Sequence, residues 1–185
     1  MKNLPPLFTD YRRYLDVELA RLEKGPGFDL VLERLREARR NRRTVFLCGN
    51  GGSAANANHF ATDLLFGLDK NPGPIWRVVS LSANASLLTC LGNDTGYENV
   101  FSKQLEVAGQ ADDLLIVYSG SGNSPNILRA LETARSKGIT SLAFLGFDGG
   151  RAKPLADLCL HFPVNDMQIV EDLHMITSHL LLRSL

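Results

Sequence analysis

The feature that most constrains this 185-residue chain is a glycine-rich run at residues 48–53, CGNGGS, between an apolar segment and a helical one. The apolar segment, residues 44–48, is typical of a β-strand. A strand, a glycine turn and a helix start in succession direct free backbone N–H groups and the positive end of a helix dipole toward one place. Ser53 can cap the helix and offer a hydroxyl group. The run therefore predicts an anion site, and it matches neither the Walker pattern nor a clean GxGxxG, which disfavours nucleotide binding.

A second run of the same kind, SGSGNS at residues 119–124, follows the apolar segment 113–118. Ser124 stands at the expected N-cap of the next helix and Pro125 in its first turn, where proline fits best. Two such turns at the ends of parallel strands would face a common crevice, which suits a phosphate monoester. Solvated loops are the alternative interpretation. The predicted phosphate-binding residues are Asn50, Gly51, Gly52, Ser53, Ser119, Ser121 and Ser124.

Strand-like and helix-like segments alternate after residue 43. The candidate strands are residues 44–48, 76–81, 113–118, 140–145 and 158–162, and a last helix is expected over about 169–184. This alternation predicts an α/β fold, a three-layer, doubly wound (flavodoxin-like) five-stranded parallel sheet. Residues 78–81 and 141–145 are continuously apolar, which predicts strands buried on both faces. We expect a single domain, 1–185, with an N-terminal helical arm at 1–42 and the sheet core and C-terminal helix at 43–185.

The N-terminal arm carries two segments with helical spacing, residues 7–22 and 28–40, interrupted at Gly25-Pro26-Gly27. Each has an apolar stripe among many charges. Two amphipathic helices exceed what one face of a small sheet can accept, which favours packing of at least one on a partner subunit. The alternative is that both lie on the surface in solvent.

Composition excludes several classes of partner. Twenty acidic residues balance twenty basic ones, so no electrostatic surface for nucleic acid or an anionic membrane is expected. The first six residues have no apolar signal core, and no apolar run approaches the length of a membrane span. Cys48, Cys90 and Cys159 form no CxxC motif and lie in apolar runs, which predicts buried, reduced thiols in a cytoplasmic protein.

Two helical segments carry candidate catalytic or metal-binding side chains. His59 and Asp63, at i and i+4, share one helix face. Glu171, His174 and His179 lie in the otherwise apolar last helix. An exposed polar pair and a core histidine are the ordinary readings of each helix alone, but together they indicate a metal or proton-transfer site. Because Glu171 and His179 are about 12 Å apart along a helix, Glu171 with His174 is an alternative pair.

The motifs, in this order and spacing, resemble those of the sugar isomerase (SIS) domain family, and more narrowly its phosphoheptose isomerase branch. The matching runs are CGNGGSAANANHFATDL, LGNDTGYENVFSKQLEVAG, SGSGNSPNILRALETA, GFDGG and VEDLHMITSHLL. The resemblance implies an isomerase that converts sedoheptulose 7-phosphate to a heptose 7-phosphate through an enediol, for heptose and lipopolysaccharide biosynthesis. It also implies a homotetramer with a zinc ion at each site and no nucleotide cofactor.

Residue by residue, the resemblance places the zinc ligands at His59, Asp63, Glu171 and His179, with Asp63 as catalytic base and His179 as acid. Three positions depart from the family pattern, which has Glu at 63, Gln at 171 and commonly Thr at 120. The shorter Asp63 retracts the carboxylate, Glu171 adds a charge and Gly120 removes a hydroxyl. Asn93 and Asp94 match a loop that lies beside the sugar, although a helix-terminating turn is an equal interpretation.

Two other functions remain open at this stage. A relative in the same family is a non-catalytic tetramer that binds the bacterial replication initiator, and its motif resembles residues 53–60 closely. That relative lacks the helix carboxylate, so Asp63 favours the enzyme. A phosphosugar-binding sensor is the third possibility, and its transcriptional form is disfavoured because no DNA-binding module is expected in this chain.

Overall fold

The computed structural model describes residues 5–67 and 75–185. Five strands form one sheet in the order β2-β1-β3-β4-β5, and every neighbouring pair is parallel. The strands are β1 (Thr44–Cys48), β2 (Arg77–Ser80), β3 (Leu114–Ser119), β4 (Thr140–Leu145) and β5 (Leu158–His161). The helices are α1 (Pro5–Lys24), α2 (Gly27–Arg40), α3 (Gly52–Thr62), α4 (Ala85–Thr95), α5 (Ser102–Ala108), α6 (Pro125–Lys137) and α7 (Met167–Ser184). The predicted doubly wound, five-stranded parallel fold is confirmed.

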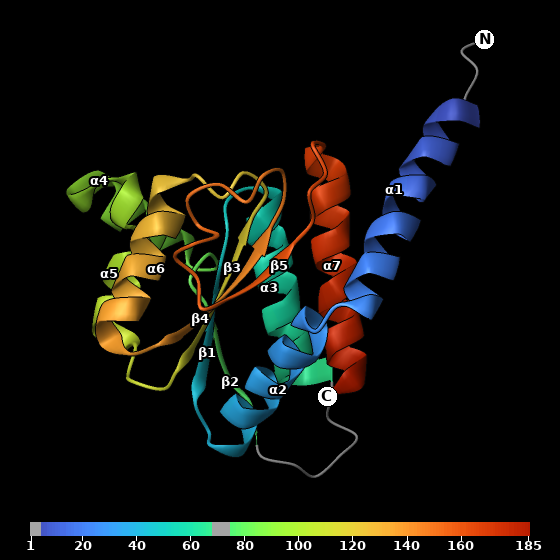
Figure 1. Cartoon of the computed structure of the whole chain (residues 1–185). Coiled ribbons are helices and arrows are strands. Elements are labelled where there is room, and N and C mark those ends of the chain that lie inside the picture. The colour runs from blue at the N-terminus through green and yellow to red at the C-terminus, as the bar shows by residue number, and fades with distance from the viewer. Residues whose placement is uncertain (1–4, 68–74) are drawn as a thin grey trace.

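Helices cover the sheet on two faces, which gives three layers (Figure 1). On one face, alternate strand residues such as Leu47, Ile116 and Phe144 pack against α2, α3 and α7. On the other face, Phe46, Val117 and their neighbours pack against α5 and α6. The near-continuous burial of β1, β3 and β4 follows from this double covering.

The strand order places the two glycine- and serine-rich turns together. The chain leaves β1 through α3 to reach β2, and it leaves β3 through α6 to reach β4 on the opposite side and the opposite face. Neighbouring β1 and β3 therefore form the topological switch point, where open α/β sheets bind ligands beyond the carboxyl ends of their strands. Both predicted phosphate turns lie at this point.

Strand β2 departs from the expected burial. Residues 78–81 were expected to be buried on both faces, but β2 is an edge strand with an alternating pattern of exposure, and Val79 is 42% exposed. The apolar sequence was a misleading signal because the sheet order leaves this edge without a neighbouring strand. Cys90 is likewise exposed rather than buried, since α4 has no buried residue, whereas Cys48 is fully buried.

The two N-terminal helices take different positions. Helix α2 packs on the sheet through Val31 and Leu35, whereas α1 runs beside α7 and projects past it (Figure 1). The Tyr11 hydroxyl donates a hydrogen bond to Asp172 of α7. Leu7 and Phe8, near the start of α1, are exposed. The arm thus keeps an apolar surface that this chain does not cover.

No helix within the described ranges is both long enough and apolar enough to cross a membrane. Residues 1–4, which form most of the segment predicted to lack a signal core, lie outside those ranges.

His174 of α7 is a core residue. Its ring lies 5.8–5.9 Å from the rings of Tyr118, Phe144 and Phe162 and has no solvent exposure. This burial lowers the pKa of His174 from 6.5 to about 3, and the Leu145 backbone opposes the shift only in part. His174 is therefore neutral in the folded protein, and its position excludes it from the polar cluster described below.

The buried His174 predicts a loss of stability in mild acid. Its folded-state pKa is depressed, so its contribution is complete above about pH 6.5 and falls as the pH drops toward 3. Between pH 7.5 and 5.0 we expect the unfolding free energy to fall by about 2 kcal/mol through this group, measured by urea denaturation.

In His174→Leu that pH-dependent component should disappear. Leu173→Ala is the matched control, because it removes a buried side chain from the same helix but keeps the imidazole. It should lower stability by about 2–5 kcal/mol at both pH values and retain the wild-type dependence on pH. An unchanged pH dependence in His174→Leu would contradict this interpretation.

Candidate functional site

A reciprocal pair of side-chain amides connects the two predicted phosphate loops. Asn50 of the first loop donates to Asn126 Oδ1 at 2.9 Å, and Asn126 donates back to Asn50 Oδ1 at 2.8 Å. The Tyr97 hydroxyl donates to the same Asn50 oxygen at 2.9 Å. Asn126 is only 1% exposed. The pair therefore fixes the spacing of the loops that follow β1 and β3.

The first loop does not use Ser53 as its cap. Gly51 occupies the N-cap of α3 with a positive φ of 55°, which glycine adopts without strain, and no side chain caps the helix from that position. Ser53 lies inside the first turn and is buried. The positive φ at position 51 is therefore the reason why this turn requires a glycine there.

The second loop is held by its own serines. Ser119 Oγ accepts the Gly122 N–H at 3.0 Å, and Ser121 Oγ accepts the Asn123 N–H at 3.3 Å. Ser124 occupies the N-cap of α6 with Pro125 in its first turn, as predicted, although its hydroxyl makes no capping bond. The hydroxyl groups of Ser119 and Ser121 can still donate their protons to an anion.

The segment at residues 146–152 supports the second loop. Arg151 N–H donates to Asn123 Oδ1 at 3.1 Å, and Ala152 N–H donates to the Gly122 carbonyl at 2.9 Å. Gly150 has a positive φ, and a Cβ there would collide with the Ser121 carbonyl. This support was not predictable from the sequence, because it depends on a contact between two separate loops.

The side chain of Met167 lies against Gly120. A Cβ at position 120 would collide with the Met167 sulfur and would lie 2.9 Å from its terminal carbon. Met167 at the start of α7 thus fills the space beside the second loop where a larger residue at 120 would project.

Three predicted residues converge at the far ends of α3 and α7. His59 Nε2 lies 2.9 Å from His179 Nε2, and Asp63 Oδ2 lies 3.3 Å from His59 Nε2 and 3.6 Å from His179 Nε2. The i, i+4 spacing brings Asp63 to His59, and the packing of α3 on α7 brings His179 to both. Asp63 also begins a π-helical turn, Asp63–Gly67, a local irregularity common at functional sites. The two histidines are about half exposed, at 48% and 47%.

The geometry of these three residues fits a divalent metal ion. In a tetrahedral zinc site with nitrogen and oxygen ligands, donor atoms are separated by about 3.3 Å, which follows from bond lengths of 2.0–2.1 Å. The three separations here lie around that value. Among the described residues, this is the one group of three or more potential ligands whose donor atoms gather within 4.8 Å. Two imidazoles and a carboxylate also form the kind of set that leaves a zinc position open to substrate.

Glu171, the fourth predicted ligand, does not join this group. Its carboxylate lies so close to Gly52 that a Cβ there would overlap it. Partial burial raises the pKa of Glu171 from its usual value, the nearby Ser53 backbone N–H opposes this shift, and the Asp172 charge adds to it. Asn56 Nδ2 donates to the Glu171 backbone carbonyl at 2.8 Å. Glu171 is therefore held at the first loop, at the opposite end of α3 from His59 and Asp63.

Asn93 and Asp94 lie in the last turn of α4 and are exposed. Asn93 Nδ2 donates to Asp94 Oδ1 at 2.7 Å, and Asp94 Oδ2 contacts Cys90 at 3.5 Å. The segment that follows α4 reaches the first loop through Tyr97. Their predicted position beside the sugar remains a prediction.

Asn126, Tyr97 and Met167 are the residues at this site that sequence reasoning missed. Asn126 follows Pro125 in an ordinary-looking helix start, so only its burial and its partner Asn50 reveal its role. Tyr97 was within a run that matched the family, but nothing in its sequence context indicated a contact with residue 50.

Comparison with known proteins places the chain among sugar phosphate isomerases. Residues 14–146 match the family model for the SIS domain. The chain is 42% identical over 174 residues to a phosphoheptose isomerase from Helicobacter pylori (strain Shi470), covering 94% of this chain and 89% of that protein. It is 39% identical over 176 residues to one from Nitratiruptor sp., covering 89% and 94%.

Two solved phosphoheptose isomerase structures have the same fold as this chain. Phosphoheptose isomerase GmhA from Neisseria gonorrhoeae superposes with a TM-score of 0.89 at 29% identity, over 99% of this chain and 96% of that one. A phosphoheptose isomerase from Francisella tularensis gives 0.90 at 26% identity, over 99% and 97%.

The Asn50–Asn126 pair predicts a measurable cost of removing one amide. Asn126→Ala leaves Asn50 without its buried partner and should lower the unfolding free energy by about 1–3 kcal/mol in urea denaturation. The exposed Asn165→Ala is the control and should stay within about 0.5 kcal/mol of the wild type. Equal stability of the two variants would show that the amide pair does not hold the loops.

Proposed function

The chain belongs to the phosphoheptose isomerase family of SIS domain proteins, and we propose that it interconverts sedoheptulose 7-phosphate and a heptose 7-phosphate through an enediol. The family resemblance predicted from the motifs is confirmed, and with it the class of aldose–ketose isomerases. We further propose that the protein acts in the cytoplasm, in the supply of heptose for lipopolysaccharide.

The observation that carries this proposal is the arrangement of two polar groups along α3. The second loop at the switch point offers hydroxyl and backbone donors suited to phosphate, while His59, Asp63 and His179 form a separate cluster. Ser53 and Asp63 are ten residues apart, about 15 Å of helix rise. The Asn50–Asn126 pair holds the second loop beside the first, so a substrate whose phosphate lies at the second loop must be extended to bring a reacting carbon to the cluster. This favours a long sugar phosphate over a three-carbon one.

Isomerisation requires a base that moves a proton between adjacent carbons. We assign Asp63 to this task, because its carboxylate is partly exposed and lies beside two imidazoles that can orient it. His179 is the complementary acid, which donates a proton to the carbonyl oxygen as the enediol forms and then takes up the proton of the neighbouring hydroxyl group as that oxygen becomes the new carbonyl. The phosphate, held by Ser119, Ser121 and Ser124, converts remote binding energy into positioning of the reacting carbons.

We propose that His59, Asp63 and His179 also hold a zinc ion. When bound, such an ion would supply polarisation of the hydroxyl–carbonyl pair. The support is the spacing of the three donor atoms and the chemistry of the set.

The proposed base can be tested by proton exchange. The wild type should exchange a carbon-bound proton of sedoheptulose 7-phosphate with solvent deuterium, measured by NMR. Asp63→Asn should reduce this exchange at least a hundredfold, because the amide has nearly the same shape but is a poor base. A chelator should slow the wild-type exchange, and added zinc should restore it.

Asp63→Glu is the matched control, since it retains the carboxylate, and it should keep measurable exchange. Proton exchange that persists in Asp63→Asn would show that another group is the base, while the proposal that the protein is an enzyme would stand. Binding of the sugar phosphate by the wild type without exchange would instead favour the non-catalytic, replication-initiator-binding alternative.

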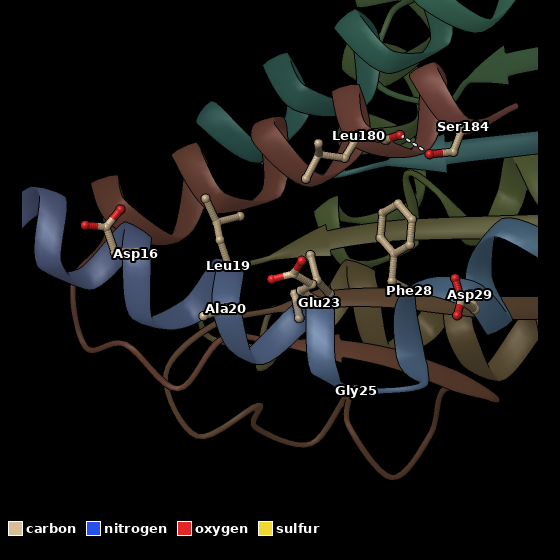
Figure 2. A pocket seen from close by; sticks show the side chains of 10 residues that line it. Asp16, Leu19, Ala20, Glu23, Gly25, Phe28, Asp29, Leu180 and Ser184 are labelled. Atoms are coloured by element: carbon tan, nitrogen blue, oxygen red, sulfur yellow. Dashed lines mark hydrogen bonds between the residues drawn. The ribbon is translucent and has the colours of Figure 1, made fainter.

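We also propose that the chain assembles into a homotetramer through the N-terminal arm and α7. A groove of about 630 Å³ lies between α1, α2 and the end of α7, with Leu19, Phe28 and Leu180 among its lining residues (Figure 2). Leu7, Phe8 and Val17 add exposed apolar surface along α1. Apolar area of this extent, next to a half-exposed catalytic cluster, is typical of a surface that another subunit covers.

Light scattering at micromolar concentration should give the mass of four chains. Replacing both Leu7 and Phe8 with Ser should shift the protein toward smaller species without loss of helix content, because neither side chain is buried in the isolated chain. A monomeric wild type would contradict the assembly.

A further inference from the structure

Glu171 places a negative charge at the loop that would otherwise be an anion site. Its carboxylate lies directly against Gly52 and near the Ser53 N–H, in the first turn of the eleven-residue helix α3. The start of a helix carries about half a positive charge, which a phosphate could use. Here an anion of the chain itself already occupies that position.

The contact is built into the packing of α7 on α3 rather than being a chance approach of a flexible side chain. Asn56 Nδ2 holds the Glu171 backbone carbonyl at 2.8 Å, and His59 meets His179 two turns farther along the same pair of helices. Gly52 leaves the space that the carboxylate needs.

From these contacts we propose that Glu171 is a specificity-determining residue that closes the first loop to phosphate and reserves it for neutral hydroxyl groups. An ionised carboxylate repels a phosphate at close range, because the effective dielectric at a protein surface is well below that of water. The same oxygens accept hydrogen bonds from sugar hydroxyl groups.

The substrate phosphate is then confined to the second loop, residues 119–124, which carries no acidic side chain. This sets the direction of the ligand and favours sugars with one phosphate and an uncharged opposite end over bisphosphates and sugar acids. The inference rests on the proposed function only in that the substrate is a phosphorylated sugar.

The test uses inorganic phosphate as the probe and the full chain treated with a chelator, so that neither sugar turnover nor a metal enters the measurement. Glu171→Gln keeps the shape and one acceptor oxygen but removes the charge, and it should bind phosphate at least tenfold more tightly in calorimetry. Asp172→Asn removes a neighbouring charge from the same helix, but its carboxylate bonds to Tyr11 rather than to the loop. The phosphate affinity of this variant should stay within about twofold of the wild-type value, because solvent and salt screen the exposed charge of Asp172.

Ser121→Ala separates the two loops. It should weaken phosphate binding by the wild type, yet leave the gain from Glu171→Gln intact, because that gain arises at the first loop. Circular dichroism melts would show that each variant is folded. An unchanged affinity in Glu171→Gln, an equal gain in Asp172→Asn, or a gain that disappears with Ser121→Ala would overturn the inference. None of these results depends on proton exchange, so the isomerase proposal stands or falls separately.

Discussion

The packing of α7 against α3 is the contact on which the rest of the site depends. At one end it presses Glu171 onto Gly52 and Ser53, and at the other it brings His179 to His59 and Asp63. The core side of α7 is anchored by apolar residues and by the neutral His174 among aromatic rings. One helix pair therefore sets both the electrostatics of the first loop and the geometry of the proposed catalytic cluster.

The sheet supplies the second constraint. Its strand order places β1 and β3 side by side with their helices on opposite faces, so the two loops meet beyond the strand ends. The Asn50–Asn126 amides then fix the loops to one another, and the segment at residues 146–152 supports the second loop from outside. Ligand binding here depends on backbone groups held rigidly, and therefore on glycines and short polar residues rather than on a cluster of cations.

Three departures from the family pattern have structural consequences. Met167 fills the space beside Gly120, Asp63 still meets both histidines despite its shorter side chain, and Glu171 lies against the first loop instead of joining the histidine cluster. The exposed apolar surface of α1 and α4 and the half-exposed histidines have a common explanation in the proposed assembly, since another subunit would cover them.

The sequence by itself determined the parallel fold, because alternating apolar strands and amphipathic helices have few other ways to bury their surfaces. It also identified both loops and the His59–Asp63 pair, since these are local patterns. The tertiary structure alone decided what depends on distant segments. It brought His179 to that pair, a grouping that only the family resemblance had implied, and it placed His174 in the core, Glu171 against the first loop and Asn126 beside Asn50. The exposure of β2 was likewise decided by the order of the strands in the sheet, because the same apolar sequence can form an edge strand or a central strand.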